Sequence, residues 1–141
     1  MKLQKLVPHA AVPTYGTPGA ACFDLRATEE VSIAPRSAEE IGTGLAFEVP
    51  EDHVMLVFSR SGHGFKNGLR LANSVGVIDS DYRGEVRVKL HNDSHNRQHV
   101  VQGDRIAQAM VLPVARMSFE LTDALSETER GAGGIGSTGV Q

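Results

Sequence analysis

Three short segments of the sequence combine polar side chains with glycine, and one of them places a carboxylate behind an apolar pair. Residues 76–84 have the sequence Gly-Val-Ile-Asp-Ser-Asp-Tyr-Arg-Gly, so Asp79 directly follows Val77 and Ile78. A carboxylate that such neighbours hold rigidly and partly desolvate is suited to act as a general base for water. The same residues are also compatible with an ordinary turn between two strands.

The second segment, residues 59–64, has the sequence Ser-Arg-Ser-Gly-His-Gly and follows an apolar run. Its Arg60 guanidinium and the hydroxyls of Ser59 and Ser61 suit phosphate oxygens, and its glycines permit close approach of a ligand. An ordinary polar turn is the alternative interpretation, because the motif is short.

The third segment is the C-terminal tail, where residues 130–141 have the sequence Arg-Gly-Ala-Gly-Gly-Ile-Gly-Ser-Thr-Gly-Val-Gln. Ordering so many glycines is entropically costly, so we expect this arm to be mobile until something binds. Its backbone N–H groups, with Arg130, Ser137 and Thr138, can wrap a polyphosphate as an anion nest. It is not a Walker A loop, which needs Lys before the Ser/Thr and a following helix. A disordered tail without function is the alternative.

Two other kinds of active site find little support in the sequence. His91, His95 and His99 recur at intervals of four, the spacing that aligns metal ligands on a helix. His91 ends an alternating strand pattern and His95 lies in a predicted turn, so we expect solvated or loop histidines instead. A serine hydrolase is not indicated either, since no strand-turn-helix nucleophile elbow is present.

Short strands must position the three segments, because glycine and proline interrupt the sequence too often for long helices. Val86, Val88 and Leu90 alternate with polar residues in the period of two that a half-buried strand shows. Many short strands separated by turns predict an all-β sandwich or barrel. Further strands are expected at residues 23–27, 31–33, 44–49, 54–59, 105–112 and 117–121.

Composition and charge favour one globular domain. No apolar run approaches the roughly 20 residues needed to cross a bilayer. A net charge of −3 without a basic tract argues against a groove for polymer nucleic acid. Residues 1–13 lack a signal-peptide pattern, so a cytoplasmic location is expected. Cys22 is the only cysteine, which excludes an intrachain disulfide and predicts a packed core thiol.

Taken in order, five motifs of the chain resemble those of the trimeric dUTP pyrophosphatase (dUTPase) family. The motifs lie at residues 21–25, 59–62, 76–84, 103–108 and 130–139, so the resemblance spans nearly the whole chain. Each motif is weak alone, and their order and spacing make the match specific. The resemblance implies a jelly-roll-like subunit over residues 1–129 and a flexible lid over residues 130–141. It also implies a homotrimer with active sites at the subunit interfaces.

The activity that the resemblance implies is Mg²⁺-assisted hydrolysis of dUTP to dUMP and pyrophosphate, which limits uracil in DNA and supplies dUMP for dTMP synthesis. By similarity, Asp79 activates the water that attacks the α-phosphorus, and Asp24 holds Mg²⁺ through bound waters. Tyr82 would pack under deoxyribose and exclude a 2′-hydroxyl. The other implied substrate contacts are Arg60, Ser61, Gly62, Asn73, Gly76, Ile78, Gln108, Arg130, Ile135, Gly136, Ser137 and Thr138.

The resemblance assigns uracil recognition to a hairpin over residues 71–78, where backbone groups and Asn73 leave no space for a 5-methyl group. Two positions depart from the family pattern: Ser59 stands where the second motif commonly begins with Pro, and Ile135 stands where the tail usually carries an aromatic residue. Isoleucine offers apolar contact to uracil without ring stacking, which predicts a looser lid and weaker substrate affinity.

Two alternative functions stay open. The dCTP deaminase family shares the fold, but it relies on a catalytic Glu where this sequence places Lys89, and it usually has Trp near the position of Tyr82. A non-catalytic regulator that binds a protein partner is the other alternative, because a fold does not fix a function. The enzyme is favoured over a pure binding module by the joint presence of the lid, Asp24, Asp79, Tyr82 and Gln108. A secondary protein partner is left open.

Overall fold

The structure is a computed structural model of the chain, and it describes residues 1–137 and 139. The described residues form one short helix, α1 (Ser61–Asn67), and otherwise strands, turns and loops. No helix among them is long and apolar enough to span a membrane. The strands are β1 (Lys2–Lys5), β2 (Thr14–Tyr15), β3 (Phe23–Arg26), β4 (Val31–Ile33), β5 (Ala38–Gly42), β6 (Leu45–Glu48), β7 (His53–Phe58), β8 (Leu69–Leu71), β9 (Val75–Ile78), β10 (Arg87–Asn92), β11 (Gln98–Val100) and β12 (Arg105–Pro113).

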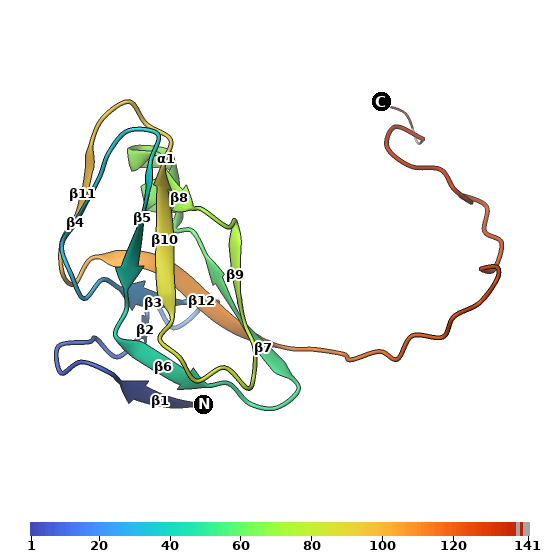
Figure 1. The fold of residues 1–141 in the computed structure, drawn as a ribbon, viewed down its shortest axis with the longest axis horizontal. Helices are drawn as coiled ribbons and strands as arrows, with labels where there is room; N and C mark the ends of the chain where they lie inside the picture. The colour runs from blue at the N-terminus through green and yellow to red at the C-terminus, as the bar shows by residue number, and fades with distance from the viewer. Residues whose placement is uncertain (138, 140–141) are drawn as a thin grey trace.

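The strands form two larger sheets and two short ladders, which Figure 1 shows stacked into one β body. The five-stranded sheet has the order β2-β3-β12-β7-β9, and the three-stranded sheet has the order β5-β10-β8. Each of these neighbours pairs in the antiparallel sense. The ladders β1-β6 and β4-β11 complete the body. This is the all-β, jelly-roll-like architecture that the short strands and frequent turns predicted.

Both sheets contribute inward-facing side chains to one hydrophobic core. In β10, Val88 and Leu90 are buried and Arg87 is exposed, as the alternation of the sequence predicted. The five-stranded sheet supplies Leu25 and Ile106, which are fully buried in the same cluster. Each buried aliphatic side chain stabilises the fold by about 1.5–3 kcal/mol, so the shared core holds the two sheets together.

Most expected strands are present, and one is not. The expected strands at 23–27, 31–33, 44–49, 54–59 and 105–112 correspond to β3, β4, β6, β7 and β12 within one residue at each end. The strand expected at 117–121 is wrong, because these residues form none. Met117, Phe119 and Leu121 alternate correctly but are largely exposed, and no strand of the described residues pairs with them. Alternation alone does not make a strand, which needs a neighbour for its backbone hydrogen bonds.

Residues 71–78 do not form the expected hairpin. β8 pairs with β10 in the three-stranded sheet, whereas β9 pairs with β7 in the five-stranded sheet. The intervening turn therefore carries the chain from one sheet to the other. Ser74 adopts a left-handed conformation there, with φ of 64°. The sequence indicated two neighbouring extended runs, but long-range pairing decided that each bonds to a different partner.

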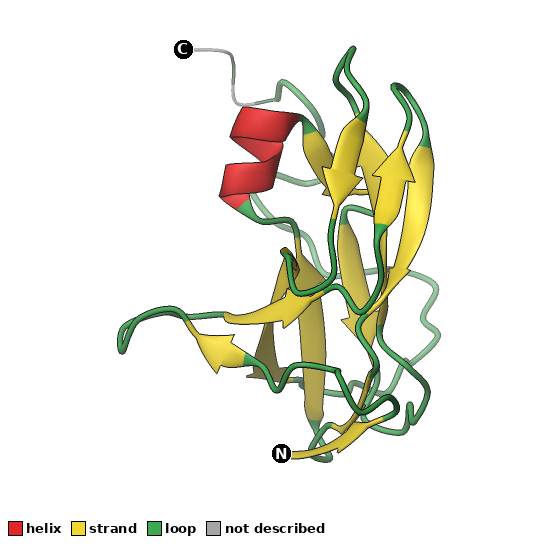
Figure 2. Ribbon diagram, turned by 90° about the vertical axis from the view of Figure 1, so that its left-hand side faces the viewer, coloured by secondary structure: helices red, strands yellow, loops and turns green. Residues whose placement is uncertain are grey.

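Residues 59–64, for which an ordinary polar turn was the alternative interpretation, lead into α1, shown in red in Figure 2. Gly68 ends this helix in the left-handed region, with φ of 66°, and its N–H donates to the His63 carbonyl. The helix buries none of its own residues. A hydrogen bond of 2.8 Å between His63 Nε2 and the Arg105 carbonyl oxygen ties it to β12.

Beyond β12 the chain leaves the β body. Residues 114–137 form turns and extended chain with neither helix nor strand. Figure 1 shows this segment as a long arm that runs away from the sheets. The Val114 N–H at its start donates to the Asp52 carbonyl of the β body at 2.7 Å, and its later hydrogen bonds are local, as in the 2.9 Å bond from Arg130 Nε to the Gly133 carbonyl. The β body and the arm are therefore separate regions of this chain.

Candidate active site

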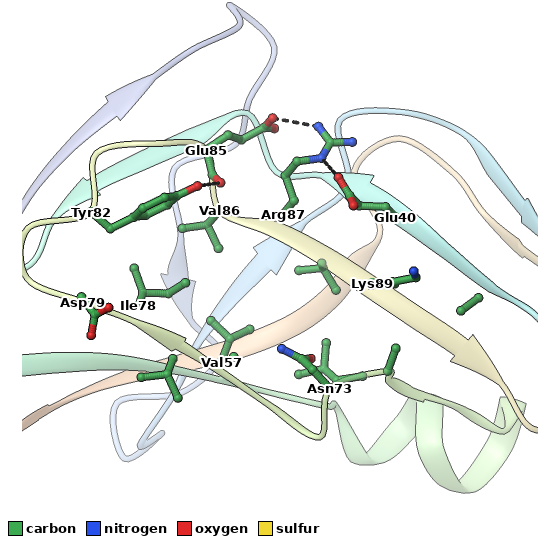
Figure 3. A pocket seen from close by; sticks show the side chains of 16 residues that line it. Glu40, Val57, Asn73, Ile78, Asp79, Tyr82, Glu85, Val86, Arg87 and Lys89 are labelled. Atoms are coloured by element: carbon green, nitrogen blue, oxygen red, sulfur yellow. Dashed lines mark hydrogen bonds and ion pairs between the residues drawn. The ribbon is translucent and has the colours of Figure 1, made fainter.

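A cavity of about 720 Å³ opens between β9, β10 and the loop that joins them (Figure 3). Because the resemblance assigns the nucleoside to residues of this lining, we call the cavity the nucleoside pocket. Its lining includes five of the residues that the sequence nominated, all within residues 73–82: Asn73, Gly76, Ile78, Asp79 and Tyr82. The structure therefore brings together the whole predicted set from the third motif and the preceding turn.

Gly76 shapes one wall of the nucleoside pocket. The register of β7 and β9 places Gly76 opposite Val57. A Cβ atom at Gly76 would lie 3.1 Å from the Val57 Cβ atom and 3.9 Å from Asn73 Nδ2. The first distance is shorter than ordinary van der Waals contact, so the absence of a side chain at Gly76 leaves space beside Val57. The result is an apolar slot with an amide at its edge.

Tyr82 forms another wall of the nucleoside pocket. Its hydroxyl donates to the Glu85 carbonyl oxygen at 2.9 Å, and its N–H donates to the Asp79 carbonyl at 3.2 Å. The ring packs over Gly84, where any Cβ atom would collide with the Tyr82 hydroxyl. The loop backbone thus fixes the ring while leaving 43% of the residue exposed.

Asp79 follows the last residue of β9 and lies at the edge of the nucleoside pocket (Figure 3). The expectation that its apolar neighbours partly desolvate the carboxylate is wrong for the single chain, because Asp79 is exposed. The side chains of β9 explain this result, since Val77 is exposed too and gives no cover. Exclusion of water from this carboxylate must come from a bound molecule, the arm or a second chain.

An ion-pair cluster that the sequence did not reveal borders the same pocket. Arg87 Nη1 lies 2.8 Å from Glu85 Oε2, and Arg87 Nε donates to Glu40 Oε1. Arg87 Nη2 lies 3.6 Å from Glu29 Oε1. The hydrogen bonds that Arg87 donates to Glu85 and Glu40 raise the pKa of Arg87. The only signal in the sequence was the charge on the outward positions of β10, which is typical of any solvated strand face.

A second hollow of about 370 Å³ lies at the start of α1, and we call it the helix hollow. It gathers Ser61 with Arg60 and Gln108, three predicted phosphate contacts, and Gly62 sits beside them within α1. Gln108 Nε2 donates to the Ser59 carbonyl at 3.0 Å, and Ser59 Oγ accepts from the Leu71 N–H at 2.8 Å. Ser59 thus links the two hollows through a bond that proline cannot make.

Asp24 supports the helix hollow from β3. Its side chain is only 12% exposed, Oδ1 accepts from Arg60 Nε at 2.9 Å, and Oδ2 accepts from Arg105 Nη1 at 3.4 Å. Across residues 1–137 and 139, no three His, Cys, Asp or Glu side chains cluster as metal ligands. Asp24 is therefore a lone carboxylate that two guanidinium groups hold in place.

Cys22, directly before β3, is half-buried and is not the core thiol that the sequence predicted. The alternation of β3 sends Phe23 and Leu25 into the core, which leaves Cys22 outside it. Burial, and then the negative charge of Asp24, raise the pKa of the Cys22 thiol. The group is therefore neutral at ordinary pH and a poor nucleophile.

The nucleoside pocket and the helix hollow have no lining residue in common. The predicted contacts of the arm line neither of them: Arg130, Ile135, Gly136 and Ser137. Thr138 lies outside the described residues. One chain alone thus presents the predicted site in three separate parts.

Comparisons with known proteins agree on one family. The sequence matches the family model described as dUTPase over residues 8–139. A deoxyuridine 5'-triphosphate nucleotidohydrolase of Desulfitobacterium hafniense is 53% identical over 132 residues, covering 92% of this chain and 87% of the relative. Another, from Nautilia profundicola, is 46% identical over 139 residues, covering 99% of this chain and 98% of the relative.

Solved structures show the same likeness. The dUTPase of Staphylococcus bacteriophage 80alpha with dUPNHPP is 26% identical and has a TM-score of 0.88, with coverage of 99% of this chain and 98% of that one. A mutant dUTPase from phage phi11 of S. aureus, described with the coordination of a structural Mg(II) ion, is similar in fold alone. It is 21% identical with a TM-score of 0.81, covering 89% of this chain and 98% of that one. The match of the family model and the high identity to the bacterial enzymes show that the chain belongs to the dUTPase family.

Proposed function

We propose that this chain hydrolyses dUTP to dUMP and pyrophosphate by holding the nucleoside in the nucleoside pocket and the attacking water at Asp79. The reaction follows from membership of the dUTPase family. The observation that carries the assignment of roles is the nucleoside pocket itself. Its lining combines apolar side chains, an amide, an aromatic ring and a carboxylate around one cavity.

Asp79 acts as the general base. Its carboxylate takes a proton from water while the water oxygen forms a bond to the α-phosphorus. The bond from the α-phosphorus to the bridging oxygen breaks, and pyrophosphate departs with that electron pair. A carboxylate that faces solvent is a weak base, so closure over the substrate has to remove competing water.

Selection of the nucleoside follows from the shape of the pocket. The low wall at Gly76 admits the flat uracil ring against Val57, and the backbone of residues 72–78 with the Asn73 amide reads its polar edge. The Tyr82 ring lies under the sugar and leaves no room for a 2′-hydroxyl. Ile78 completes the apolar lining. A 5-methyl group on the base finds no space in so narrow a slot.

The helix hollow binds the phosphates. Arg60 uses Nε for Asp24 and Nη1 for the Arg105 carbonyl, which fixes the guanidinium plane and leaves Nη2 for a phosphate oxygen. The Ser61 hydroxyl and the Gln108 amide lie in the same hollow, with the Gly62 backbone beside them. A planar, positioned guanidinium is well suited to phosphate recognition.

A homotrimer with active sites at the subunit interfaces reconciles the separate parts. The nucleoside pocket and the helix hollow share no residue, so different chains supply them to one dUTP molecule. Residues 130–141 close over that molecule as a lid. Ile135 then contacts the base, while Arg130, Gly136, Ser137 and Thr138 contact phosphates. Ordering of the lid on substrate excludes water and protects the attacking step.

Mg²⁺ fits this arrangement as an ion that arrives with the triphosphate. Asp24 is one carboxylate whose two oxygens each retain a lone pair beyond their arginine contacts, which suits contact through bound waters and not direct chelation. When bound, the ion offsets the charge of the phosphate oxygens and favours departure of pyrophosphate. The isolated position of Asp24 agrees with the reluctance of Mg²⁺ to lose its waters.

The test is a substrate panel. Purified protein is mixed with Mg²⁺ and dUTP, dCTP, dTTP or UTP, while pyrophosphate, monophosphate and ammonia are measured. Pyrophosphate from dUTP alone, lost in Asp79→Asn, supports the proposed reaction and its base. Ammonia from dCTP would support the deaminase instead, although the pocket offers Lys89 where that chemistry needs a Glu. A folded oligomer inert toward every nucleotide would support a binding role.

A further inference from the structure

A backbone carbonyl oxygen holds the Tyr82 hydroxyl, so the position of the Tyr82 ring depends on the position of residue 85. Among residues 1–137 and 139, the one hydrogen bond from this hydroxyl goes to the Glu85 carbonyl oxygen at 2.9 Å, as Figure 3 shows. Glu85 belongs to the loop between β9 and β10, outside the ladder hydrogen bonds of either strand. The position of the sugar wall therefore depends on whatever fixes Glu85.

Two kinds of contact hold this residue: the Val86 N–H of the same peptide unit donates to the Leu45 carbonyl at 2.8 Å, and the Glu85 side chain is anchored as well. Its Oε1 atom accepts a hydrogen bond from the Gly44 N–H at 2.7 Å, which links it to the turn between β5 and β6. Its Oε2 atom accepts from Arg87 Nη1 at 2.8 Å. Both carboxylate oxygens are thus engaged, one by backbone of another element and one by a guanidinium.

Arg87 offsets a local excess of negative charge. Glu40 on β5 and Glu29 before β4 contact the same guanidinium as Glu85. Glu29 is itself anchored by the Gly42 N–H at 2.8 Å, so it is not free to move aside. Removal of Arg87 would leave three carboxylates close together, and their repulsion would act on Glu85.

Stability alone does not explain this cluster. The Arg87 side chain is 41% exposed, and exposed ion pairs contribute little to folding free energy. The geometry has a more specific consequence, because the chain of contacts runs from Arg87 through the Glu85 carboxylate to the carbonyl that holds Tyr82. A displaced Glu85 would release the hydroxyl and let the ring shift.

We propose that Arg87 is a positioning residue for sugar selection: it holds Glu85 in place, and Glu85 holds the Tyr82 ring where it rejects a 2′-hydroxyl. This inference rests on the proposed function, in which Tyr82 lies under the deoxyribose. It assigns discrimination between deoxyribonucleotides and ribonucleotides to a residue that touches neither the sugar nor the reacting atoms.

The test compares kcat/KM for dUTP and UTP in Arg87→Gln. The ratio of the two values should fall by about three- to tenfold, the equivalent of one hydrogen bond, with most of the change in UTP turnover. Arg70→Gln is the matched control, because it also removes an exposed arginine ion pair, with Asp93 at 2.7 Å, but lies on β8 outside this cluster. Thermal unfolding of both variants separates loss of fold from loss of selectivity.

Tyr82→Phe shows whether the effect travels through the hydroxyl. This variant keeps the ring and removes its hydrogen bond, so Tyr82→Phe by itself should lower the ratio of kcat/KM for dUTP to kcat/KM for UTP. In the double variant, Arg87→Gln should lower that ratio no further. Glu85→Gln, which weakens the pairing with Arg87, should lower the ratio in the same direction and serves if Arg87→Gln does not fold. Wild-type hydrolysis of dUTP in the same assay reports separately on the proposed function. With normal wild-type activity, an unchanged ratio in Arg87→Gln, or effects of Arg87→Gln and Tyr82→Phe that multiply independently, would overturn the inference.

Discussion

The nucleoside pocket and the helix hollow are built in different ways. The nucleoside pocket rests on core packing, with Val57 and Leu71 buried beneath it and Gly76 set by strand register. The helix hollow rests on a helix that buries no residue and on the ion pair between Arg60 and Asp24. The nucleoside pocket is therefore a cavity whose shape is fixed by packing within one chain. The helix hollow is a set of charged and polar groups held mainly by ion pairs and hydrogen bonds.

Under the proposed function, this difference divides the work of the enzyme between the two hollows. Close packing gives a fixed shape, and a fixed shape can distinguish uracil from thymine. Positioned guanidinium and hydroxyl groups give strength toward phosphate without reading the base. Variants in the nucleoside pocket should change selectivity, whereas variants in the helix hollow should weaken every triphosphate alike.

The largest expected effect is at Asp79, the proposed general base. Asp79→Asn keeps the size of the side chain and removes the base, so kcat for dUTP should fall by about 10²- to 10⁴-fold with little change in KM. Steady-state release of pyrophosphate measures both constants. Asp81→Asn is the matched control, since Asp81 is an exposed carboxylate of the same loop, and it should retain wild-type kcat. Equal losses in the two variants would show that loop charge, and not a base, is what matters.

The next effect is on the phosphate side. Arg60→Gln removes a charge-assisted contact, so kcat/KM for dUTP should fall by about tenfold to a hundredfold, while dUMP inhibition should change much less. Arg105→Gln is the control, because Arg105 is the other partner of Asp24 and has no proposed phosphate contact. Similar losses in both variants would mean that Arg60 acts only by holding Asp24.

A smaller effect is expected in the slot of the nucleoside pocket. Gly76→Ala introduces a methyl group 3.1 Å from the Val57 Cβ atom, so the wall of the slot has to shift, and overpacking of this kind costs about 1–3 kcal/mol of folding stability. KM for dUTP and the inhibition constant of dUMP should therefore both rise about tenfold, unlike in Arg60→Gln. Gly16→Ala should change neither, because a Cβ atom there meets nothing within 4 Å. An unchanged inhibition constant of dUMP in Gly76→Ala would show that uracil does not bind in this slot.

Sequence reasoning recovered what local pattern controls. The period of two located β10, and the motif at 76–84 located Asp79 and Tyr82 on one loop. Local pattern could not predict which strands pair, since β8 and β9 pair with strands that are distant in sequence. The Arg87 cluster was hidden for the same reason, because Glu29 and Glu40 approach it from other elements.

The exposure of Asp79 and of residues 117–121 has a different cause. Asp79 was expected to be partly desolvated and residues 117–121 to form a strand, but among the described residues nothing covers either of them. The patterns behind these two expectations, an apolar pair before Asp79 and alternation at 117–121, are properties of the sequence. The β body of this chain does not cover Asp79 or residues 117–121. A local pattern along one chain does not encode contacts with a second chain.

The smallest expected effect tests to which hollow the arm belongs. Ile135 is fully exposed on the arm, and Ile135→Phe adds a ring that can stack on uracil, worth about 0.5–1.5 kcal/mol, so KM for dUTP should fall about two- to tenfold. Ile135→Leu keeps an aliphatic side chain of equal size and should leave KM unchanged. If the phenylalanine variant also leaves KM unchanged, residue 135 does not reach the base. The arm would then act on phosphates alone, and the nucleoside pocket would select its substrate without help from the lid.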